Sequence, residues 1–128
     1  MNDTGHARAV QDDLERRVQE LAGPDPAASA DLLADVLRGF VDSLPGDLAA
    51  LAAAINDRDA QALREGAHRV KSAACNIGAT GVASLSGELE GLGAGAPVGQ
   101  LVEAMGRLRA EAETVEQAAT GVVARLRG

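Results

Sequence analysis

The chain has 128 residues, an apolar fraction of 46% and a formal net charge of −7, which suits one domain with a packed core. The acidic balance argues against nucleic acid as the main partner, because contacts to phosphates require a basic patch, and it also argues against an anionic membrane surface. Only Phe40 is aromatic, and a core of Ala, Leu and Val favours closely packed helices over a β-sandwich. The composition therefore predicts an all-α fold.

The single cysteine, Cys75, excludes an internal disulfide framework and fits a reducing compartment. The N-terminus lacks the apolar region of a signal peptide, and no apolar run is long enough to span a membrane. We therefore expect a cytoplasmic protein. Its initial methionine and its full set of predicted helices favour a freestanding protein, and we expect a monomer.

The predicted elements begin with a frayed end over residues 1–5 and a short amphipathic helix over 6–21. The apolar stripe of this helix consists of Val10, Leu14, Val18 and Leu21. Because the stripe is narrow, the helix is expected to lie on a larger body. Gly-Pro-Asp-Pro at 23–26 predicts a turn.

A second helix is predicted to begin near Ser29, and its apolar spacing continues in phase as far as Ile55. Pro45 removes one backbone hydrogen bond and crowds the preceding turn, so we expect a kink or a brief break there. Residues 56–59 form the next turn, in which Asp59 is a candidate N-cap.

The third helix is predicted over 60–77, with Gly78 as its left-handed end. Its core-facing seam consists of Leu63, Ala67, Val70, Ala74 and Ile77. A fourth helix over 81–92, a loop over 91–97 and a regular last helix over 101–126 follow.

Four apolar-striped helices joined by short loops predict an antiparallel four-helix bundle with a short additional N-terminal helix. The whole chain, 1–128, is predicted to be one domain, whose core bundle covers residues 29–127. The sequence has no internal repeat, and no Gly-rich phosphate loop follows a strand pattern.

Residues 67–79 place His68 on the wet side of the third helix. The face that adjoins the core seam carries Arg64, His68, Lys71, Ser72 and Cys75. Imidazole is a good nucleophile near neutral pH when an acceptor holds its other nitrogen as N–H. Glu88 and Glu90 on the fourth helix are both candidate acceptors, and the spacing does not choose between them.

On spacing alone, an exposed histidine on an amphipathic helix is more often a solvated surface residue than a reactive one. His6 lacks comparable surroundings and is predicted to be inert. Two histidines and one cysteine argue against a zinc site. Cys75 is predicted to be a small packing residue.

Residues 68–79 read His-Arg-Val-Lys-Ser-Ala-Ala-Cys-Asn-Ile-Gly-Ala. This stretch resembles the motif of histidine-containing phosphotransfer (HPt) domains of multistep phosphorelays, which is His-x-x-Lys followed by small residues, an apolar residue and Gly. The resemblance extends to 40–45, 57–63 and 85–90. The first and last helices match only in pattern.

The resemblance implies a phosphocarrier that has no nucleotide site or kinase activity of its own. His68 would be phosphorylated through Nε2, Lys71 would lie near the phosphoryl group, and Glu90 would orient the imidazole through Nδ1. The partners would be receiver domains and a hybrid histidine kinase. Mg²⁺ and the carboxylates that bind it would come from the receiver.

The same resemblance implies that Arg64, Ser72 and Cys75 belong to a receiver-docking face. Ser72 stands where the family commonly has Gly, and its hydroxyl lies where the receiver would pack closely. Apolar residues of the first helix and of the half-helix before His68 are expected to complete a patch there. Two alternatives stay open: a binding-only bundle of this fold with an unused histidine, and an adaptor or dimerisation bundle that matches the motif by chance.

Overall fold

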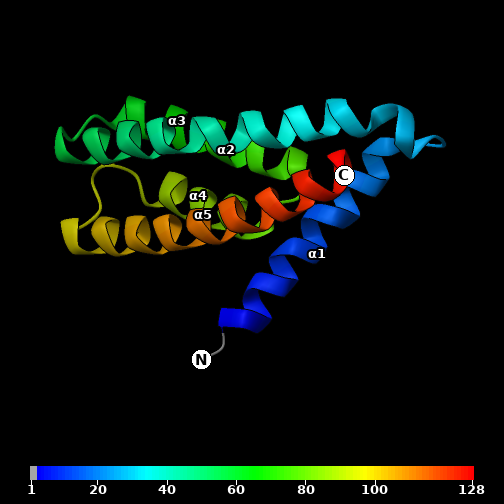
Figure 1. The fold of residues 1–128 in the computed structure, drawn as a ribbon. Coiled ribbons are helices and arrows are strands. Elements are labelled where there is room, and N and C mark those ends of the chain that lie inside the picture. The colour runs from blue at the N-terminus through cyan, green and yellow to red at the C-terminus, as the bar shows by residue number, and fades with distance from the viewer. Residues whose placement is uncertain (1–2) are drawn as a thin grey trace.

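The computed structural model describes residues 3–128, which form five helices and no strand (Figure 1). The helices are α1 (Asp3–Ala22), α2 (Pro26–Asn56), α3 (Ala60–Ile77), α4 (Thr80–Leu92) and α5 (Val98–Arg127). In the bundle, α2 packs against α3 and α5, and α4 also packs against α3 and α5. Helix α1 crosses one end of this bundle at a steep angle (Figure 1). The predicted all-α bundle is confirmed.

The core lies between the apolar stripes that the sequence predicts. All five seam residues of α3 are buried: Leu63, Ala67, Val70, Ala74 and Ile77. The stripe of α5 is buried from Leu101 to Val122, and Leu126 is partly buried. Burial of these two stripes fixes which face of α3 is left for solvent.

Local capping fixes both ends of α3 where the sequence predicts them. The side chain of Asp59 accepts a hydrogen bond from the Ala62 amide at 3.0 Å. Gly78 ends the helix in the left-handed conformation, with a φ of 83°. A Cβ at Gly78 would lie 2.7 Å from Cβ of Arg17, so this glycine also lets α1 pass close to the end of α3.

Helix α2 continues through Pro45 to Asn56, so the brief break, which was one of the two outcomes expected at this proline, does not occur. Leu44 and Leu48 are buried on either side of the proline, and their packing holds the segment helical despite the missing backbone donor. The helix also begins earlier than predicted, at Pro26, because Asp25 caps the amide of Ala28.

Helix α1 begins at Asp3, so the predicted frayed end was wrong for residues 3–5, while residues 1–2 lie outside the described part of the chain. With 20 residues, α1 is longer than the predicted helix. It is held by Thr80, whose hydroxyl donates to Asp13 at 3.1 Å, and by Arg17, whose Nε donates to the Asn76 carbonyl at 2.9 Å. These contacts tie α1 to the junction of α3 and α4.

Within the described residues, no helix has both the length and the apolar character that crossing a membrane requires.

Candidate functional site

His68 lies on the outer face of α3, beside the neighbouring helix α4. Its side chain is 63% exposed, and its Nδ1 lies 3.3 Å from Oε2 of Glu90, which is 26% exposed. Of the two ring nitrogens, Nδ1 is therefore the one that faces a carboxylate. The remaining nitrogen, Nε2, is left for a reaction with an external group.

Glu90 also contacts Lys71, one turn after His68. Nζ of Lys71 lies 3.7 Å from Oε1 of Glu90, so the two carboxylate oxygens face two different basic groups. The alkyl chain of Lys71 passes over Gly87 of α4, since a Cβ there would lie 3.6 Å from Cδ of Lys71. Gly87 was not predicted as part of the site, although it lies inside the predicted fourth helix, five residues before its end.

Glu88, the second candidate acceptor, points to another partner. Its carboxylate forms an ion pair with Arg107 of α5 and is not paired with His68. The two glutamates are two residues apart and therefore lie on different faces of α4. The geometry thus brings Glu90, rather than Glu88, to the histidine.

The sequence model of the Hpt domain family matches residues 35–118, which is well over half of the chain. The chain belongs to the Hpt domain family. Hpt domains are phosphocarriers that take part in histidine phosphotransfer, in phosphorelays with receiver domains and histidine kinases. The matched range contains His68, Lys71 and Glu90 and leaves out α1. Comparisons with curated proteins and with solved structures found no match.

The predicted docking residues of this Hpt domain all lie at the surface. Arg64, Ser72 and Cys75 are exposed along α3, on the same side as His68. The prediction that Cys75 is a packing residue was wrong, because Ala74 and Ile77 fill the adjacent core positions.

Most of the apolar side chains expected in the docking patch are buried. Val10, Leu14 and Val18 of α1 are buried against the bundle, and so is Leu63 of the half-helix before the histidine. The large apolar side chains that stay exposed on α1 and the first half of α2 are Leu21, Leu32 and Val36. Leu21 and Val36 line a shallow hollow together with Ile77, at the far end of α3.

His6, for which the sequence indicated no partner, lies beside a carboxylate in the structure. Its Nε2 lies 2.6 Å from Oε1 of Glu111 on α5. The side chain of Glu111 is only 11% exposed, and its Oε2 is buried without a hydrogen-bond partner. The two residues are 105 positions apart, so no local pattern connects them.

Among the described residues, no three or more His, Cys, Asp or Glu side chains group in a way that would hold a metal ion.

Proposed function

We propose that His68 of this Hpt domain accepts a phosphoryl group through Nε2 from an aspartyl phosphate on a receiver domain, and that it returns the group to a receiver aspartate. The observation that carries this proposal is the pairing of Nδ1 with Glu90 on an exposed imidazole. This pairing selects the tautomer in which Nδ1 carries the proton and the lone pair is on Nε2.

The transfer step balances without a further reactant. The Nε2 lone pair attacks phosphorus, an N–P bond forms, and the P–O bond to the receiver aspartate breaks to release its carboxylate. The imidazole keeps its Nδ1 proton and gains a positive charge, which the Glu90 carboxylate at 3.3 Å offsets. Transfer in the opposite direction reverses each bond change.

Lys71 supplies the cation of this chain near the reacting group. Its Nζ lies 3.7 Å from Oε1 of Glu90. Because the side chain is 44% exposed, the ammonium has room to turn toward phosphoryl oxygens at His68. The transition state spreads negative charge over the equatorial oxygens, which a nearby cation stabilises. We propose that Mg²⁺ and its carboxylate ligands are on the receiver.

We propose that the receiver docks along α3 from His68 past Ser72 and Cys75. Ile77 lies nine residues after His68, or about 13 Å along the helix axis. The exposed apolar side chains Leu21 and Val36 lie at that end, beside Ile77. The face therefore offers an apolar area at one end and the reactive histidine at the other, as a protein-docking surface requires.

Incubation with a panel of phosphorylated receiver domains and Mg²⁺ tests this function. The proposal predicts acid-labile, base-stable label on the chain from at least one receiver, and no label on His68→Gln. If no receiver transfers label while several still bind the chain, the protein is a binding module and the proposal is wrong.

Blocking the docking face is expected to stop transfer without unfolding the bundle. Ser72→Trp places a bulky ring beside His68, where the receiver must approach, and is expected to slow transfer by about a hundredfold. Ala73→Trp, on an exposed position around the same helix, is the matched control and is expected to transfer normally. Equal transfer rates of the two variants, both folded by circular dichroism, would place the docking face elsewhere.

The exposed thiol of Cys75 fits a reducing compartment, and we propose a cytoplasmic location on that basis.

A further inference from the structure

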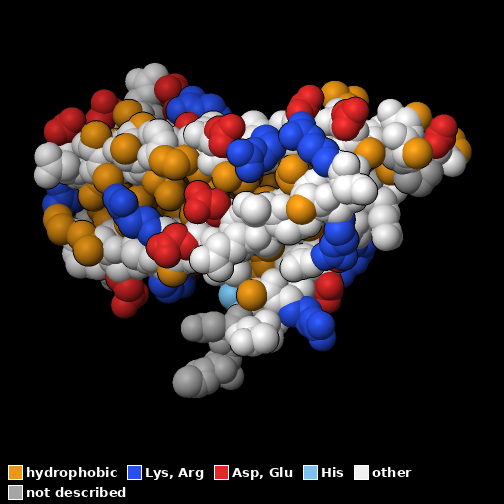
Figure 2. All heavy atoms as spheres, viewed as in Figure 1, with side chains coloured by type: hydrophobic (Ala, Val, Ile, Leu, Met, Phe, Trp, Pro, Cys, Tyr) orange, Lys and Arg blue, Asp and Glu red, His pale blue; other side chains and the backbone are white. Residues whose placement is uncertain are grey.

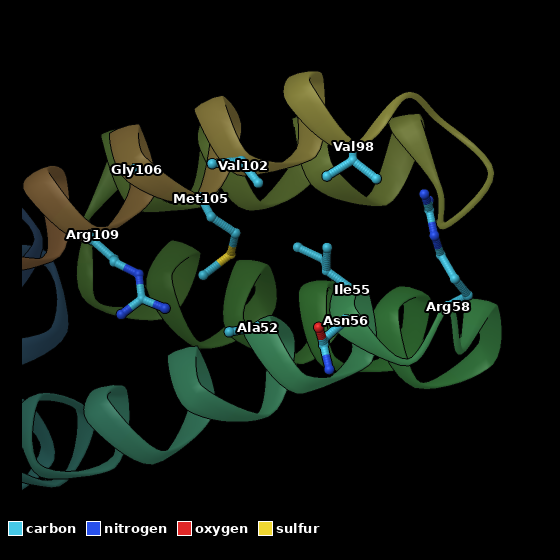
Figure 3. Close-up of a pocket in the computed structure, with 9 residues that line it drawn as sticks. All are labelled: Ala52, Ile55, Asn56, Arg58, Val98, Val102, Met105, Gly106 and Arg109. Carbon is cyan, nitrogen blue, oxygen red and sulfur yellow. The ribbon is translucent and has the colours of Figure 1, made fainter.

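A second hollow lies between α2 and α5, on the seam of the bundle opposite the α3–α4 seam that carries His68. Its volume is about 440 Å³, which is within the range of small-molecule sites. The apolar part of its wall consists of Ala52, Ile55, Val98, Val102 and Met105 (Figure 3). Figure 2 shows apolar side chains gathered between α2 and α5 at this end of the molecule.

The charged residues that line this hollow are both arginines, although the chain has 19 acidic and 12 basic residues. Figure 3 shows Arg109 at one end of the hollow and Arg58 at the other. Arg109 makes no ion pair or side-chain hydrogen bond with any residue that the structure describes. Glu113 and Glu116 line the adjoining hollow together with Arg109, but neither forms an ion pair with it, so its planar fork of N–H donors is open to a carboxylate ligand.

Arg58 has a different role, because it closes the far end of the hollow. Its Nη1 donates to the carbonyls of Ala94 and Ala96, at 2.9 and 3.3 Å. These bonds tie the loop between α4 and α5 to the end of α2. The hollow is thus bounded by a fixed loop at one end and by an available guanidinium at the other.

Two large apolar side chains on its rim are exposed to solvent. Val98 and Val102 are 48% and 59% exposed, and they lie one turn apart on α5. From Val98 to Arg109 the helix advances 11 residues, which is about 16 Å. An extended alkyl chain that lies along this length would remove both valines from water.

We propose that this hollow binds a linear amphipathic anion, a medium- to long-chain carboxylate. The head group would pair with Arg109, and the chain would run between the apolar walls of α2 and α5 toward Val98. The hollow is closed at the Arg58 end and offers one unpaired cation, Arg109. A single linear molecule with one anionic head group therefore fits it better than a docked helix. The site lies on the opposite seam from His68, so it is separate from the proposed phosphotransfer.

The probe is sodium dodecanoate below its critical micelle concentration. It is added to the full-length protein, and its binding is followed by the amide chemical shifts of the protein. Shifts confined to residues of α2 and α5 around the hollow are expected, together with saturable binding. Dodecyltrimethylammonium, with the same chain and opposite charge, is expected to bind at least tenfold more weakly, because loss of one charge-assisted hydrogen bond costs about that factor.

Two variants locate the head group. Arg109→Gln is expected to weaken dodecanoate binding about tenfold, while Arg107→Gln, on the same helix outside the hollow, leaves it unchanged. Val102→Asn is expected to weaken binding of the chain. Absence of shifts, equal binding of the cationic detergent, or equal binding by Arg109→Gln overturns the proposal, and so does displacement of the shifts to α1 or α3.

Discussion

The molecule contains two histidine–glutamate pairs that differ in their exposure and in the ring nitrogen that faces the carboxylate. In the outer pair, His68 and Glu90 are 63% and 26% exposed, and the contact involves Nδ1. In the inner pair, His6 and Glu111 are 54% and 11% exposed, and the contact involves Nε2. The same two residue types thus use opposite edges of the imidazole.

If His68 is the phosphoryl acceptor, as we propose, a histidine beside a carboxylate does not by itself make one. At the outer pair, the carboxylate faces Nδ1 and not Nε2, and Lys71 lies one turn away at the same carboxylate. At the inner pair, Glu111 holds Nε2, and its own second oxygen is enclosed at Gly81. We infer that the inner pair fastens α1 to α5.

Replacement of each histidine by glutamine is expected to give the largest difference between the two pairs, in the rate of phosphoryl transfer. His68→Gln is expected to abolish phosphoryl acceptance, because glutamine has no nucleophilic nitrogen. His6→Gln is expected to keep the wild-type rate of transfer, measured with the same labelled receiver. Comparable loss in the two variants would remove the functional distinction between the pairs.

A methyl group at Gly81 tests how tightly the inner pair is enclosed. A Cβ there would lie 2.2 Å from Oε2 of Glu111, so Gly81→Ala is expected to lower the free energy of unfolding by about 2 kcal/mol. Gly91→Ala, at the other end of α4 with nothing within 4 Å of the added carbon, is the control and is expected to be neutral or slightly stabilising. Urea unfolding measures both.

The penalty of Gly81→Ala is expected to disappear in a Glu111→Ala background, because the carboxylate is the group that the methyl meets. A penalty that persists without Glu111 would show that the glycine is needed for another reason.

Removal of the groups around His68 is expected to have a smaller effect on transfer. Lys71→Ala and Glu90→Ala are each expected to slow phosphoryl transfer about tenfold, which equals about 1.4 kcal/mol of transition-state stabilisation. Glu88→Ala is the matched control, since Glu88 pairs with Arg107. Single-turnover transfer from a receiver measures all three, and an equal loss in Glu88→Ala would contradict the assignment of Glu90.

The smallest expected effects concern stability, measured after truncation of each histidine to alanine. His6→Ala leaves the buried carboxylate of Glu111 without this partner and is expected to cost about 1 kcal/mol. His68→Ala is expected to change the free energy of unfolding by less than about 0.5 kcal/mol, because its side chain is mostly exposed. A double-mutant cycle of His6 with Glu111 measures the coupling, and a coupling of zero would deny the fastening role.

Local signals allowed α3 and its outer face to be predicted from the sequence. Asp59 and Gly78 are capping residues that act on their own backbone, and the seam at helical spacing fixes which side is buried. The exposed position of His68 follows from that seam. The choice of Glu90 over Glu88 required the family pattern, and the packing of α4 then brought Glu90 to the histidine.

Long-range packing accounts for what the sequence did not predict. The continuous path of α2 through Pro45 depends on the burial of leucines on both sides, which outweighs the local preference of proline. The contact of His6 with Glu111 joins α1 to α5, which are far apart in the sequence. Which apolar residues stay exposed depends on how α1 covers the bundle. The spacing of apolar residues within a single helix does not predict these contacts between helices.

The identity of the phosphorylated nitrogen tests the proposed role of His68. Phosphorus and nitrogen NMR of the ¹⁵N-histidine-labelled protein, phosphorylated by a receiver, distinguishes the two ring positions. We expect a single phosphohistidine at His68, with phosphorus on Nε2 and the proton on Nδ1. Phosphorus on Nδ1 of His68, or on His6, would contradict it.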